Sequence, residues 1–282
     1  MTALYDRCAE DAAASVIAVY STSFALACRL LGPRVRGHVR NIYALVRIAD
    51  EIVDGAAADA GVSAPEQARL LDEFEVETLL ATAAGFSTNL VVHAFALTAR
   101  ECGIGADLVT PFFASMRTDL TQTAHDDVSH DVYVYGSAEV VGLMCLQAFV
   151  NAGKPAPVAP APDLVDGARR LGAAFQDVNF LRDLADDRDR LGRDYLGLGD
   201  GRVSRAEVLD RIDADLDAAA RAIPRLPADC RRAVTTAHGL FAELARRLRT
   251  EDAGVRVSVP NHVKAAIAAK AIAGIPPRRS TA

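Results

Sequence analysis

Apolar residues recur along most of the chain at the three- and four-residue spacing of helices, and alternating runs typical of strands are hard to find. A glycine–proline pair at 32–33 marks the end of a first long helix, predicted over about 11–31, and the start of a second over about 33–54. A proline-rich loop over 151–162 precedes another apolar helix, which the glycines of 192–201 close. The pattern therefore predicts an all-α fold.

Two more helix starts are indicated by capping signals. Ser63–Glu66 and Ser204–Glu207 have the Ser-x-x-Glu spacing of a capping box, in which side chains satisfy the free amides at a helix start. Both precede apolar residues at helical spacing. No linker divides the chain convincingly, and all-helical folds of this length can form one unit. We therefore expect a single domain over residues 1–282.

Two of the predicted helices carry a polar stripe in otherwise apolar surroundings. The stripe on the helix over 33–54 consists of Tyr43, Arg47, Asp50 and Asp54. The stripe on the later helix consists of Gln176, Asn179, Asp183 and Asp187. In each stripe two aspartates four residues apart leave one helix face about one turn apart. An arginine, Arg47 or Arg182, stands just before each pair.

The two acidic stripes need a compensating cation or solvent. Like charges at this spacing destabilise an isolated helix by about 0.2–0.5 kcal/mol per pair. Apolar residues surround both stripes, and an unpaired carboxylate in such a wall is costly to ionise. A single pair would be interpreted as a solvated helix face. Two pairs, each with its own arginine, favour a paired Mg²⁺ site for diphosphates, formed by two helices that face each other across a cavity.

Composition narrows the class of protein. A net charge of −6 argues against a nucleic-acid-binding surface, which would need a basic stripe. The five cysteines lie far apart and are odd in number, which favours a reduced compartment and packing roles. The N-terminus lacks the pattern of a secretory signal, so we expect a cytoplasmic protein. The longest apolar stretch, Val140–Val150, is too short to span a bilayer and predicts a buried helix.

Other candidate sites are weaker. His125–Asp131 contains metal-binding residue types without a recognised zinc spacing, and its polar surroundings predict a solvated loop. The sequence has no Gly-rich phosphate loop, no Gly-x-Ser-x-Gly and no His-Glu-x-x-His. Phosphate chemistry is therefore expected to rest on Mg²⁺.

Five segments resemble the squalene and phytoene synthase family, the head-to-head trans-isoprenyl diphosphate synthases, and the similarity extends over nearly the whole chain. The segments are Ser21–Phe24, Tyr43–Asp54, Tyr133–Met144, Phe175–Asp183 and Arg193–Leu196. The sequences at 135–144 and 175–183, together with 256–261 and Lys264, are most similar to those of bacterial phytoene synthases. The resemblance implies an isoprenoid-synthase helical bundle around a central cavity.

The resemblance implies that the stripes hold two or three Mg²⁺ ions, with Mn²⁺ as a substitute, which bridge to the diphosphates of two prenyl substrates. The metal ligands would be Asp50, Asp54, Asp183 and Asp187. The residues that complete or tune this shell would be Glu51, Asn179 and Asp186. Arg47, Arg182 and Arg193 would stabilise the leaving diphosphate as the allylic C–O bond breaks.

The resemblance also implies contacts to the rest of the substrates. Hydroxyl and amide groups at the phosphate end would come from Ser21, Ser23, Tyr43, Gln176 and Tyr195. An apolar wall that excludes water and folds the prenyl tails would come from Phe24, Tyr133, Ala138, Val141, Gly142 and Leu143. Ordinary core packing is the alternative interpretation of each wall residue. The proton acceptor stays open between released diphosphate and a tyrosine.

The implied activity is that of a prenyltransferase, phytoene synthesis: two geranylgeranyl diphosphates give phytoene via prephytoene diphosphate and release two diphosphates. No NADPH is expected, because the chain shows neither a Gly-rich nucleotide motif nor the C-terminal anchor common in reductive squalene synthases. The alternatives are a farnesyl diphosphate enzyme that makes dehydrosqualene, presqualene diphosphate or squalene, and an enzyme that makes a cyclised terpene. A non-catalytic assembly factor is disfavoured, because its metal-binding aspartates would be lost.

Three positions depart from the family pattern. Asp50-Glu51 replaces the common Asp-Asp, Glu139 replaces a frequent glycine, and Asp177 stands where Lys, Leu or Thr is usual. These changes should not prevent ionisation of the prenyl diphosphate, and they do not indicate the chain length of the substrate. Residues 263–279 mix apolar and basic residues, so they could contact an anionic membrane surface, although a plain terminal helix is the preferred interpretation. The sequence indicates no oligomeric state.

Overall fold

The computed structural model describes residues 3–122, 126–186, 195–196, 198, 201, 203–251 and 257–277, apart from the side chains at 22–23, 127 and 185–186. The described residues form helices and connecting segments and no strand, which confirms the all-α class. In chain order the helices are α1 (Ala3–Tyr20), α2 (Thr22–Arg29), α3 (Pro33–Val53), α4 (Ala56–Asp59), α5 (Ala64–Ala84), α6 (Leu90–Cys102), α7 (Ala106–Asp119), α8 (Asp127–Val134), the π-helical turn η1 (Tyr135–Glu139), α9 (Val140–Asn151), α10 (Pro162–Asp186), α11 (Arg205–Ala222), the 3₁₀ turn η3 (Ile223–Arg225), α12 (Ala228–Thr250) and α13 (Asn261–Ile272).

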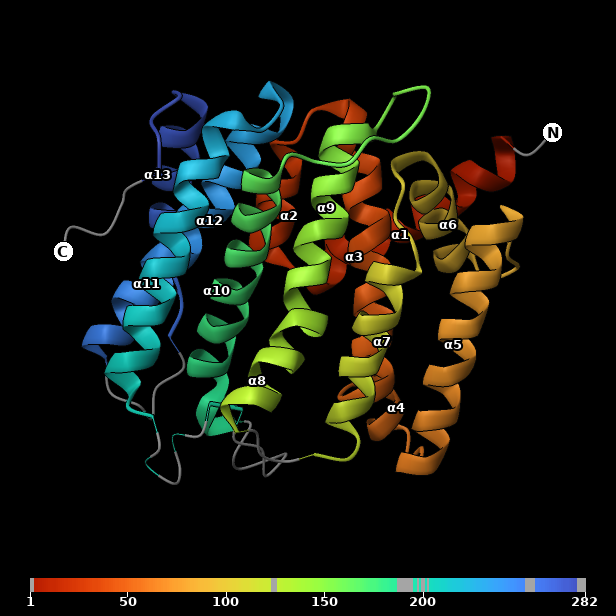
Figure 1. Cartoon of the computed structure of the whole chain (residues 1–282), viewed down its shortest axis with the longest axis horizontal. Helices are drawn as coiled ribbons and strands as arrows, with labels where there is room; N and C mark the ends of the chain where they lie inside the picture. Colours follow the sequence, from red (N-terminus) through yellow and green to blue (C-terminus); the bar gives the residue numbers. More distant parts are fainter. Residues whose placement is uncertain are drawn as a thin grey trace.

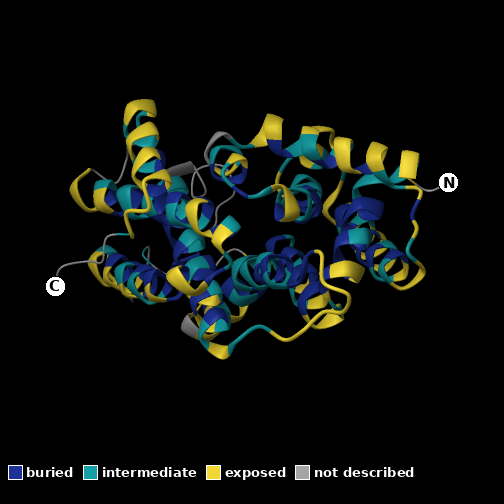
Figure 2. Cartoon of the chain, turned by 90° about the horizontal axis from the view of Figure 1, so that it is seen from above, coloured by how far each residue is buried: buried dark blue, intermediate teal, exposed yellow. Residues whose placement is uncertain are grey.

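The long helices stand side by side as one bundle, with α5 at one end, α11 and α13 at the other, and α3, α9 and α10 between them (Figure 1). Buried positions face the interior of this bundle and exposed positions face outward (Figure 2). One large apolar cluster draws mainly on α3, α6, α7 and α9, and a second draws on α10, α11 and α12. Helices α9 and α10 pack on each other where the two clusters meet.

The first predicted helix, over 11–31, is wrong in its boundaries. Helix α1 begins at Ala3, and the chain breaks at Ser21, whose extended backbone makes it the N-cap of α2. The Ser21 hydroxyl accepts a hydrogen bond from the Phe24 amide at 3.0 Å. The second predicted helix is confirmed as α3, and Asp54 is its C-cap. The predicted proline-rich loop is confirmed between α9 and α10.

One of the two predicted capping boxes is formed. At the start of α11, the Glu207 amide donates to the Ser204 hydroxyl at 3.2 Å, and the Ser204 amide donates to the Glu207 carboxylate at 2.8 Å. Helix α5 also begins where predicted, but Ser63 makes no side-chain cap. The carboxylate of Glu66 is engaged instead by Arg69, whose Nε lies 3.0 Å from it.

The predicted solvated loop over His125–Asp131 is wrong for its described residues, 126–131. Asp126 and Ser129 form a capping box that starts α8. His130 is buried, and its Nε2 lies 3.1 Å from the carboxylate of Asp177 on α10. Arg211 on α11 donates to the same carboxylate at 2.9 Å. This buried pairing, which local polarity does not reveal, holds a polar segment in a helix.

The apolar stretch predicted as a buried helix belongs to a longer helical run. Residues Val128–Asn151 are long and apolar enough to cross a membrane by length and composition, and half of an apolar 18-residue window within them is buried inside the bundle. The run contains the π-helical turn η1, where one extra residue shifts the helical register.

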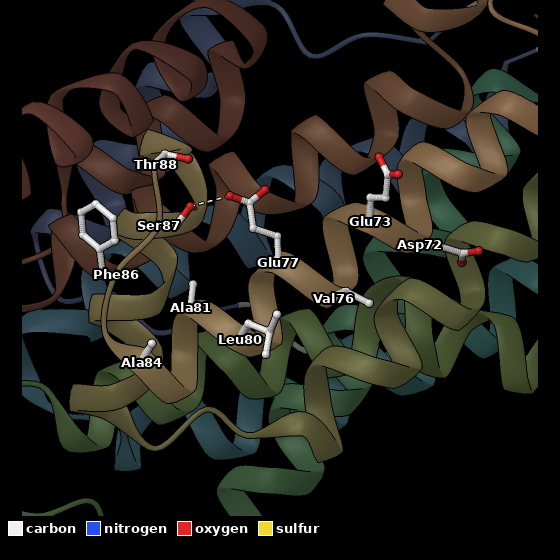
Figure 3. A pocket seen from close by; sticks show the side chains of 10 residues that line it. All are labelled: Asp72, Glu73, Val76, Glu77, Leu80, Ala81, Ala84, Phe86, Ser87 and Thr88. Atoms are coloured by element: carbon white, nitrogen blue, oxygen red, sulfur yellow. Dashed lines mark hydrogen bonds between the residues drawn. The ribbon is translucent and has the colours of Figure 1, made fainter.

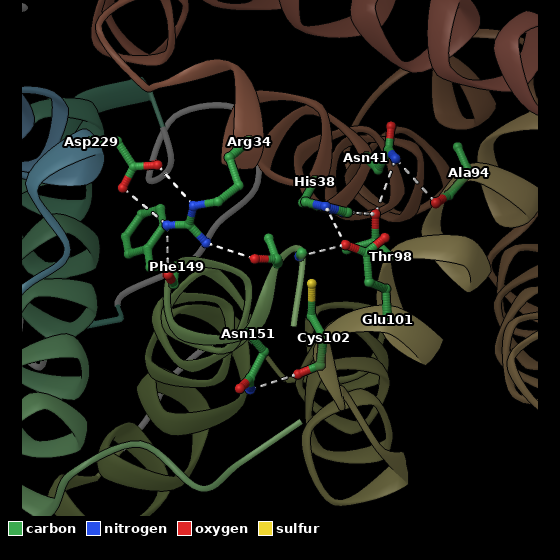
Figure 4. Close-up of polar contacts among 12 residues, drawn as sticks. Arg34, His38, Asn41, Ala94, Thr98, Glu101, Cys102, Phe149, Asn151 and Asp229 are labelled. Carbon is green, nitrogen blue, oxygen red and sulfur yellow. Dashed lines mark hydrogen bonds and ion pairs between the residues drawn. The ribbon is translucent and has the colours of Figure 1, made fainter. Parts of the chain in front are cut away.

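Arg34 at the start of α3 ties three helices together (Figure 4). Its guanidinium donates to the carbonyls of Phe149 and Ala152 at the end of α9, at 3.0 and 2.9 Å, and to both carboxylate oxygens of Asp229 on α12, at 2.9 Å each. These carbonyls are free acceptors at a helix C-terminus, so the contact supplies a cap as well as an ion pair. It lies about 24 Å from Asp50 along α3.

We expect Arg34→Gln to lower the free energy of unfolding by about 1–2 kcal/mol, because both side chains of the ion pair are about one third exposed and the pair is therefore partly screened. The Arg34 hydrogen bond lowers the pKa of Asp229, so its stabilising effect should be present at neutral pH and lost as the pH falls below about 4. Urea unfolding of both proteins at pH 7 and pH 3.5 tests this: an equal difference at both values would contradict it.

Candidate active site

A cavity of about 1090 Å³ lies inside the bundle. Its wall includes residues of α1, α2, α3 and α7 to α13. Along α10 the lining extends from Leu164 to Asp183, which is about 28 Å at the rise of an α-helix. One end of the cavity is acidic and the other is apolar, with Val39, Phe149, Ile223 and Leu226 in its wall.

Both predicted polar stripes line this cavity. Helix α3 contributes Tyr43, Arg47, Asp50 and Asp54, and α10 contributes Gln176, Asn179 and Asp183. Arg182 also lines it. Residues more than a hundred positions apart in the chain therefore meet at one end of a shared space. Asp187 and Arg193 lie outside the described residues, as do the side chains of Asp186 and Ser23.

Arg47 is enclosed by aromatic and acidic neighbours. Its guanidinium lies 4.5 Å from the centre of the Tyr20 ring, pairs with Glu51, and lies 3.9 Å from Asp50. Glu51 differs from its expected place, because it does not line the cavity. Its carboxylate accepts from the Ala56 amide at 2.8 Å as well as from Arg47, so it caps the short helix α4.

Asp50 is the most strongly perturbed carboxylate of this end. Burial raises the pKa of Asp50 to about 7, Arg47 opposes that rise, and the negative charges of Asp54, Asp119 and Glu51 add to it. About 40% of the Asp50 side chain is accessible through the cavity, but protein surrounds the carboxylate closely. Burial and the neighbouring negative charges both raise its pKa. The nearby arginine does not neutralise this group of carboxylates.

The α10 side has a simpler arrangement. Arg182 pairs within its own helix, and its Nε lies 3.0 Å from the carboxylate of Asp183, the next residue. Asn179 and Gln176 lie about one and two turns before Asp183 on α10, and both line the same cavity. Carboxylate and amide oxygens on two helices are the donor types that Mg²⁺ prefers.

The surplus of negative charge around Asp50 fits a divalent cation. Within the described residues, however, no three His, Cys, Asp or Glu side chains already stand close enough to hold a metal ion. The carboxylates of the two stripes would have to converge when cations bind, and Arg47 and Arg182 would have to move off their present partners.

An aromatic cluster forms the wall beside the acidic end. The Phe24 ring centre lies 6.3 Å from that of Tyr43, 6.0 Å from that of Phe175 and 5.8 Å from that of Phe241. Phe175 and Phe241 are stacked at 3.8 Å. Ser21, at the N-cap of α2, lines the cavity beside them. Phe24 is 37% exposed, so part of its ring is accessible.

The predicted wall residues of the α8–α9 run also line the cavity, except Leu143, which packs against the core. Those that line it are Tyr133, Ala138, Val141 and Gly142. A Cβ at Gly142 would lie 2.6 Å from the carbonyl oxygen of Ala168, and one at Gly172 would lie 2.6 Å from that of Ala138. Gly142 allows α9 to lie close to α10, and Gly172 allows α10 to lie close to η1. Gly142 therefore serves packing as well as the cavity wall.

The site residues expected from the sequence did not include Asp119, Ser137, Ser258 or Lys264, which also line the cavity. Ser137, Ser258 and Lys264 lie in segments that were noted only as part of a resemblance. Asp119, the last residue of α7, is 6% exposed and accepts hydrogen bonds from Tyr133 and Tyr195, at 2.8 and 2.9 Å. No motif marks it, because its partners are distant in the sequence.

Two departures from the family pattern are explained by ion pairs outside the cavity. Glu139 accepts from Arg169 Nε at 2.6 Å. Asp177, 2% exposed, pairs with His130 and Arg211. Neither acidic residue lines the cavity, so these changes concern helix packing.

A second hollow, of about 550 Å³, lies on α5 and the segment that follows it (Figure 3). Its floor includes the exposed side chains of Val76, Leu80 and Phe86. Ser87 donates to Glu77 across one side at 2.5 Å. The predicted site residues do not line it.

Comparisons with known proteins give matches over most of the chain. The sequence profile described as squalene/phytoene synthase matches residues 17–200. A chloroplastic phytoene synthase of Narcissus pseudonarcissus is 32% identical over 219 residues, which cover 73% of this chain and 48% of that protein. A 15-cis-phytoene synthase of a Paracoccus species is 30% identical over 251 residues, which cover 81% of this chain and 78% of that protein. The chain thus spans about half the length of the plant relative.

The fold has a solved counterpart. A crystal structure of a dehydrosqualene synthase in complex with ligand superposes with a TM-score of 0.78 at 21% identity, over 97% of this chain and 98% of that one. This likeness confirms the expected helical bundle.

We expect Lys264→Gln to weaken the binding of inorganic diphosphate about tenfold, because a lysine ammonium in a cavity wall strengthens hydrogen bonds to an anion. Lys264 forms no ion pair with the described residues and is half-buried at the cavity, whereas Lys270 on the same helix is exposed. Lys270→Gln is therefore the matched control. Calorimetric titration of both variants checks this, and equal affinities would show that Lys264 does not face the anion.

Proposed function

Because the chain belongs to the squalene/phytoene synthase family, we propose that it is a phytoene synthase, which condenses two geranylgeranyl diphosphates head to head via prephytoene diphosphate and releases two diphosphates. The observation that carries the proposal is the polarity of the cavity. Two acidic stripes on α3 and α10 line one end, and the rest of a space about 28 Å long is largely apolar. Such a space suits a substrate with one charged head and a long hydrocarbon tail.

Asp50, Asp54 and Asp183 would hold Mg²⁺ or Mn²⁺ together with Asp187, and Asn179 would add an amide oxygen. The cations supply Lewis-acid stabilisation of the diphosphate that leaves when the allylic C–O bond breaks. Arg47 and Arg182 line the same end and would add positive charge to that diphosphate. The ammonium group of Lys264 on α13 would add a further positive charge near that diphosphate.

After ionisation the chain must keep a carbocation away from water. The aromatic wall of Phe24, Phe175 and Phe241 and the apolar faces of Val141 and Leu240 line the cavity beyond the acidic end. They would fold the tails so that the double bond of the second substrate meets the first cation. The product then forms by a second ionisation, rearrangement and loss of a proton, without a covalent bond to the protein.

The depth of the cavity supports a C20 substrate. An extended geranylgeranyl chain is about 20 Å long, from C–C bonds of about 1.5 Å at ordinary angles, and a farnesyl chain is about 15 Å long. The lining from Asp183 to Leu164 extends about 28 Å, which leaves room for a diphosphate and a C20 tail. The phytoene synthases among the relatives support the same choice.

A farnesyl diphosphate enzyme is the second candidate. The observation that favours it is the likeness over 97% of the chain to a dehydrosqualene synthase. A C15 tail would also fit a cavity that accepts a C20 tail. Dehydrosqualene, presqualene diphosphate, squalene or a cyclised terpene would be its product.

We propose that the protein is cytoplasmic. Because the proposed product is a hydrocarbon, we also propose that the protein contacts the membrane where this product leaves. The end of α13 supports this, because Ile272 and Ile275 are about half exposed near Lys270.

The activity is tested by incubating the protein with Mg²⁺ and either C15 or C20 diphosphate, without NADPH, and analysing hydrocarbons and released diphosphate. Phytoene from the C20 substrate is the expected result. A C30 or cyclic product would favour the second candidate and retain the ionisation. Absence of diphosphate release from both substrates would contradict both candidates.

We expect Asp50→Asn and Asp183→Asn each to reduce turnover about 100-fold or more, because each removes a charge that would hold metal with little change of volume. The helical fold should persist, as measured by circular dichroism. Asp215→Asn is the control: Asp215 is a buried carboxylate that pairs with Arg170 and does not line the cavity. Near-normal turnover of either site variant would remove that residue from the metal site.

We expect Mg²⁺ affinity to rise with pH and level off above about 7, because burial and like charge raise the pKa of Asp50 and Mg²⁺ binds its ionised form. Without metal, the stability from this raised pKa is present below about pH 4 and lost as the pH rises through about 7. Magnesium should therefore stabilise the protein more at pH 8 than at pH 5.5. Calorimetry and thermal unfolding check both effects, and a pH-independent affinity would contradict them.

A further inference from the structure

Asp119 occupies an unusual place in the cavity wall. It is the last residue of α7, where the unpaired carbonyls of the helix end repel a negative charge. Its side chain is 6% exposed, and its charge contributes to the raised pKa of Asp50. Burial, the helix end and a neighbouring carboxylate all oppose an ionised group there, so specific contacts must stabilise it.

Two phenols supply such contacts. Tyr133 Oη donates to one carboxylate oxygen of Asp119 at 2.8 Å, and Tyr195 Oη donates to the other at 2.9 Å. The tyrosines are 4% and 6% exposed and both line the cavity. Each oxygen of one carboxylate thus holds one hydroxyl, and three segments separated in the chain are joined at this point.

The two phenols belong to a stack of rings. Tyr195 and Phe180 are stacked at 4.3 Å with an angle of 11°, and the Tyr133 ring centre lies 5.3 Å from Tyr195 and 5.9 Å from Phe180. Phe180 follows Asn179 on α10 and shares its helix with Asp183, so the stack stands at the acidic end. This is the end at which the allylic cation of the proposed reaction would form.

We propose that Asp119 is a positioning residue for that cation: by accepting both hydroxyl hydrogens, it fixes the rings of Tyr133 and Tyr195 and makes them more electron-rich beside the reacting carbons. A hydroxyl that donates to a carboxylate carries more negative charge on its oxygen, and this charge spreads into the ring. Aromatic faces attract cations through their quadrupole, and the attraction is strongest where water is excluded. This inference rests on the proposed function, because it concerns the same reaction.

The arrangement also changes an expectation about Tyr195. Its hydroxyl was expected to donate to a diphosphate oxygen, but its hydrogen is donated to Asp119. A phenol that donates its only hydrogen to a carboxylate can meet a further group only as an acceptor, which suits a cation or a proton rather than an anion.

The experiment is a mutant cycle on the active protein. Asp119→Asn and the double variant Tyr133→Phe/Tyr195→Phe are compared with the triple variant, with kcat and KM measured per folded molecule. We expect Asp119→Asn and the tyrosine pair each to lower kcat about tenfold or more and to change KM less than about threefold. In the triple variant the Asp119 change should add less than about threefold, because it acts through the hydroxyls.

Two controls separate positioning from a general loss of structure. Asp215→Asn removes another buried carboxylate, and Tyr135→Phe removes a hydroxyl two residues from Tyr133; neither residue lines the cavity, and both variants should keep the wild-type kcat. If the Asp119 variant does not fold, the single variants Tyr133→Phe and Tyr195→Phe still test the positioning role. Each keeps Asp119 and the aromatic ring at the mutated position and removes only one hydroxyl.

The outcomes distinguish this inference from the proposed function. Unchanged kcat in both tyrosine variants, or a full Asp119 effect in the triple variant, would overturn the positioning role while the wild type still releases diphosphate. A wild type that releases none from C15 or C20 substrate would overturn the proposed function and this role with it.

Discussion

The structure depends on keeping several carboxylates ionisable inside an apolar bundle. Asp50 and Asp54 at the end of α3, Asp183 on α10 and Asp119 on α7 all line one end of a cavity whose other walls are largely apolar. Burial and mutual repulsion would drive such groups to bind protons, as the raised pKa of Asp50 illustrates. A bound cation removes that conflict. We propose that the charge that is unfavourable on its own would then bind a diphosphate through that cation.

Two other parts of the bundle hold these carboxylates in place despite their repulsion. Close packing of α10 against α9 at Gly142 and against η1 at Gly172 sets the wall that faces α3. At the far end, the Arg34 contacts with α9 and α12 hold the helices together about 24 Å from Asp50. A rigid scaffold can tolerate repulsion at one end because the stabilising contacts lie elsewhere.

Features with a local cause could be predicted from the sequence. The stripes on α3 and α10 follow from helical spacing, and the α11 cap follows from a four-residue pattern. Features that depend on distant partners could not. His130 joins a helix because Asp177 and Arg211 receive it, and Asp119 enters the site because two remote tyrosines bond to it. Glu51 accepts from the Ala56 amide as well as from Arg47, and the contact with Ala56 could not be predicted because it is made by a very short helix.

The central claim is that the two acidic stripes act together as one divalent-cation site for a prenyl diphosphate. Anomalous diffraction from crystals grown with Mn²⁺ and a non-reactive prenyl thiodiphosphate tests it most directly. We predict Mn²⁺ ions bridged between the α3 carboxylates Asp50 and Asp54, Asp183 of α10 and the diphosphate, with the tail toward Phe149 and Leu226. Metal bound to one stripe alone, or a diphosphate bound away from both, would contradict the account.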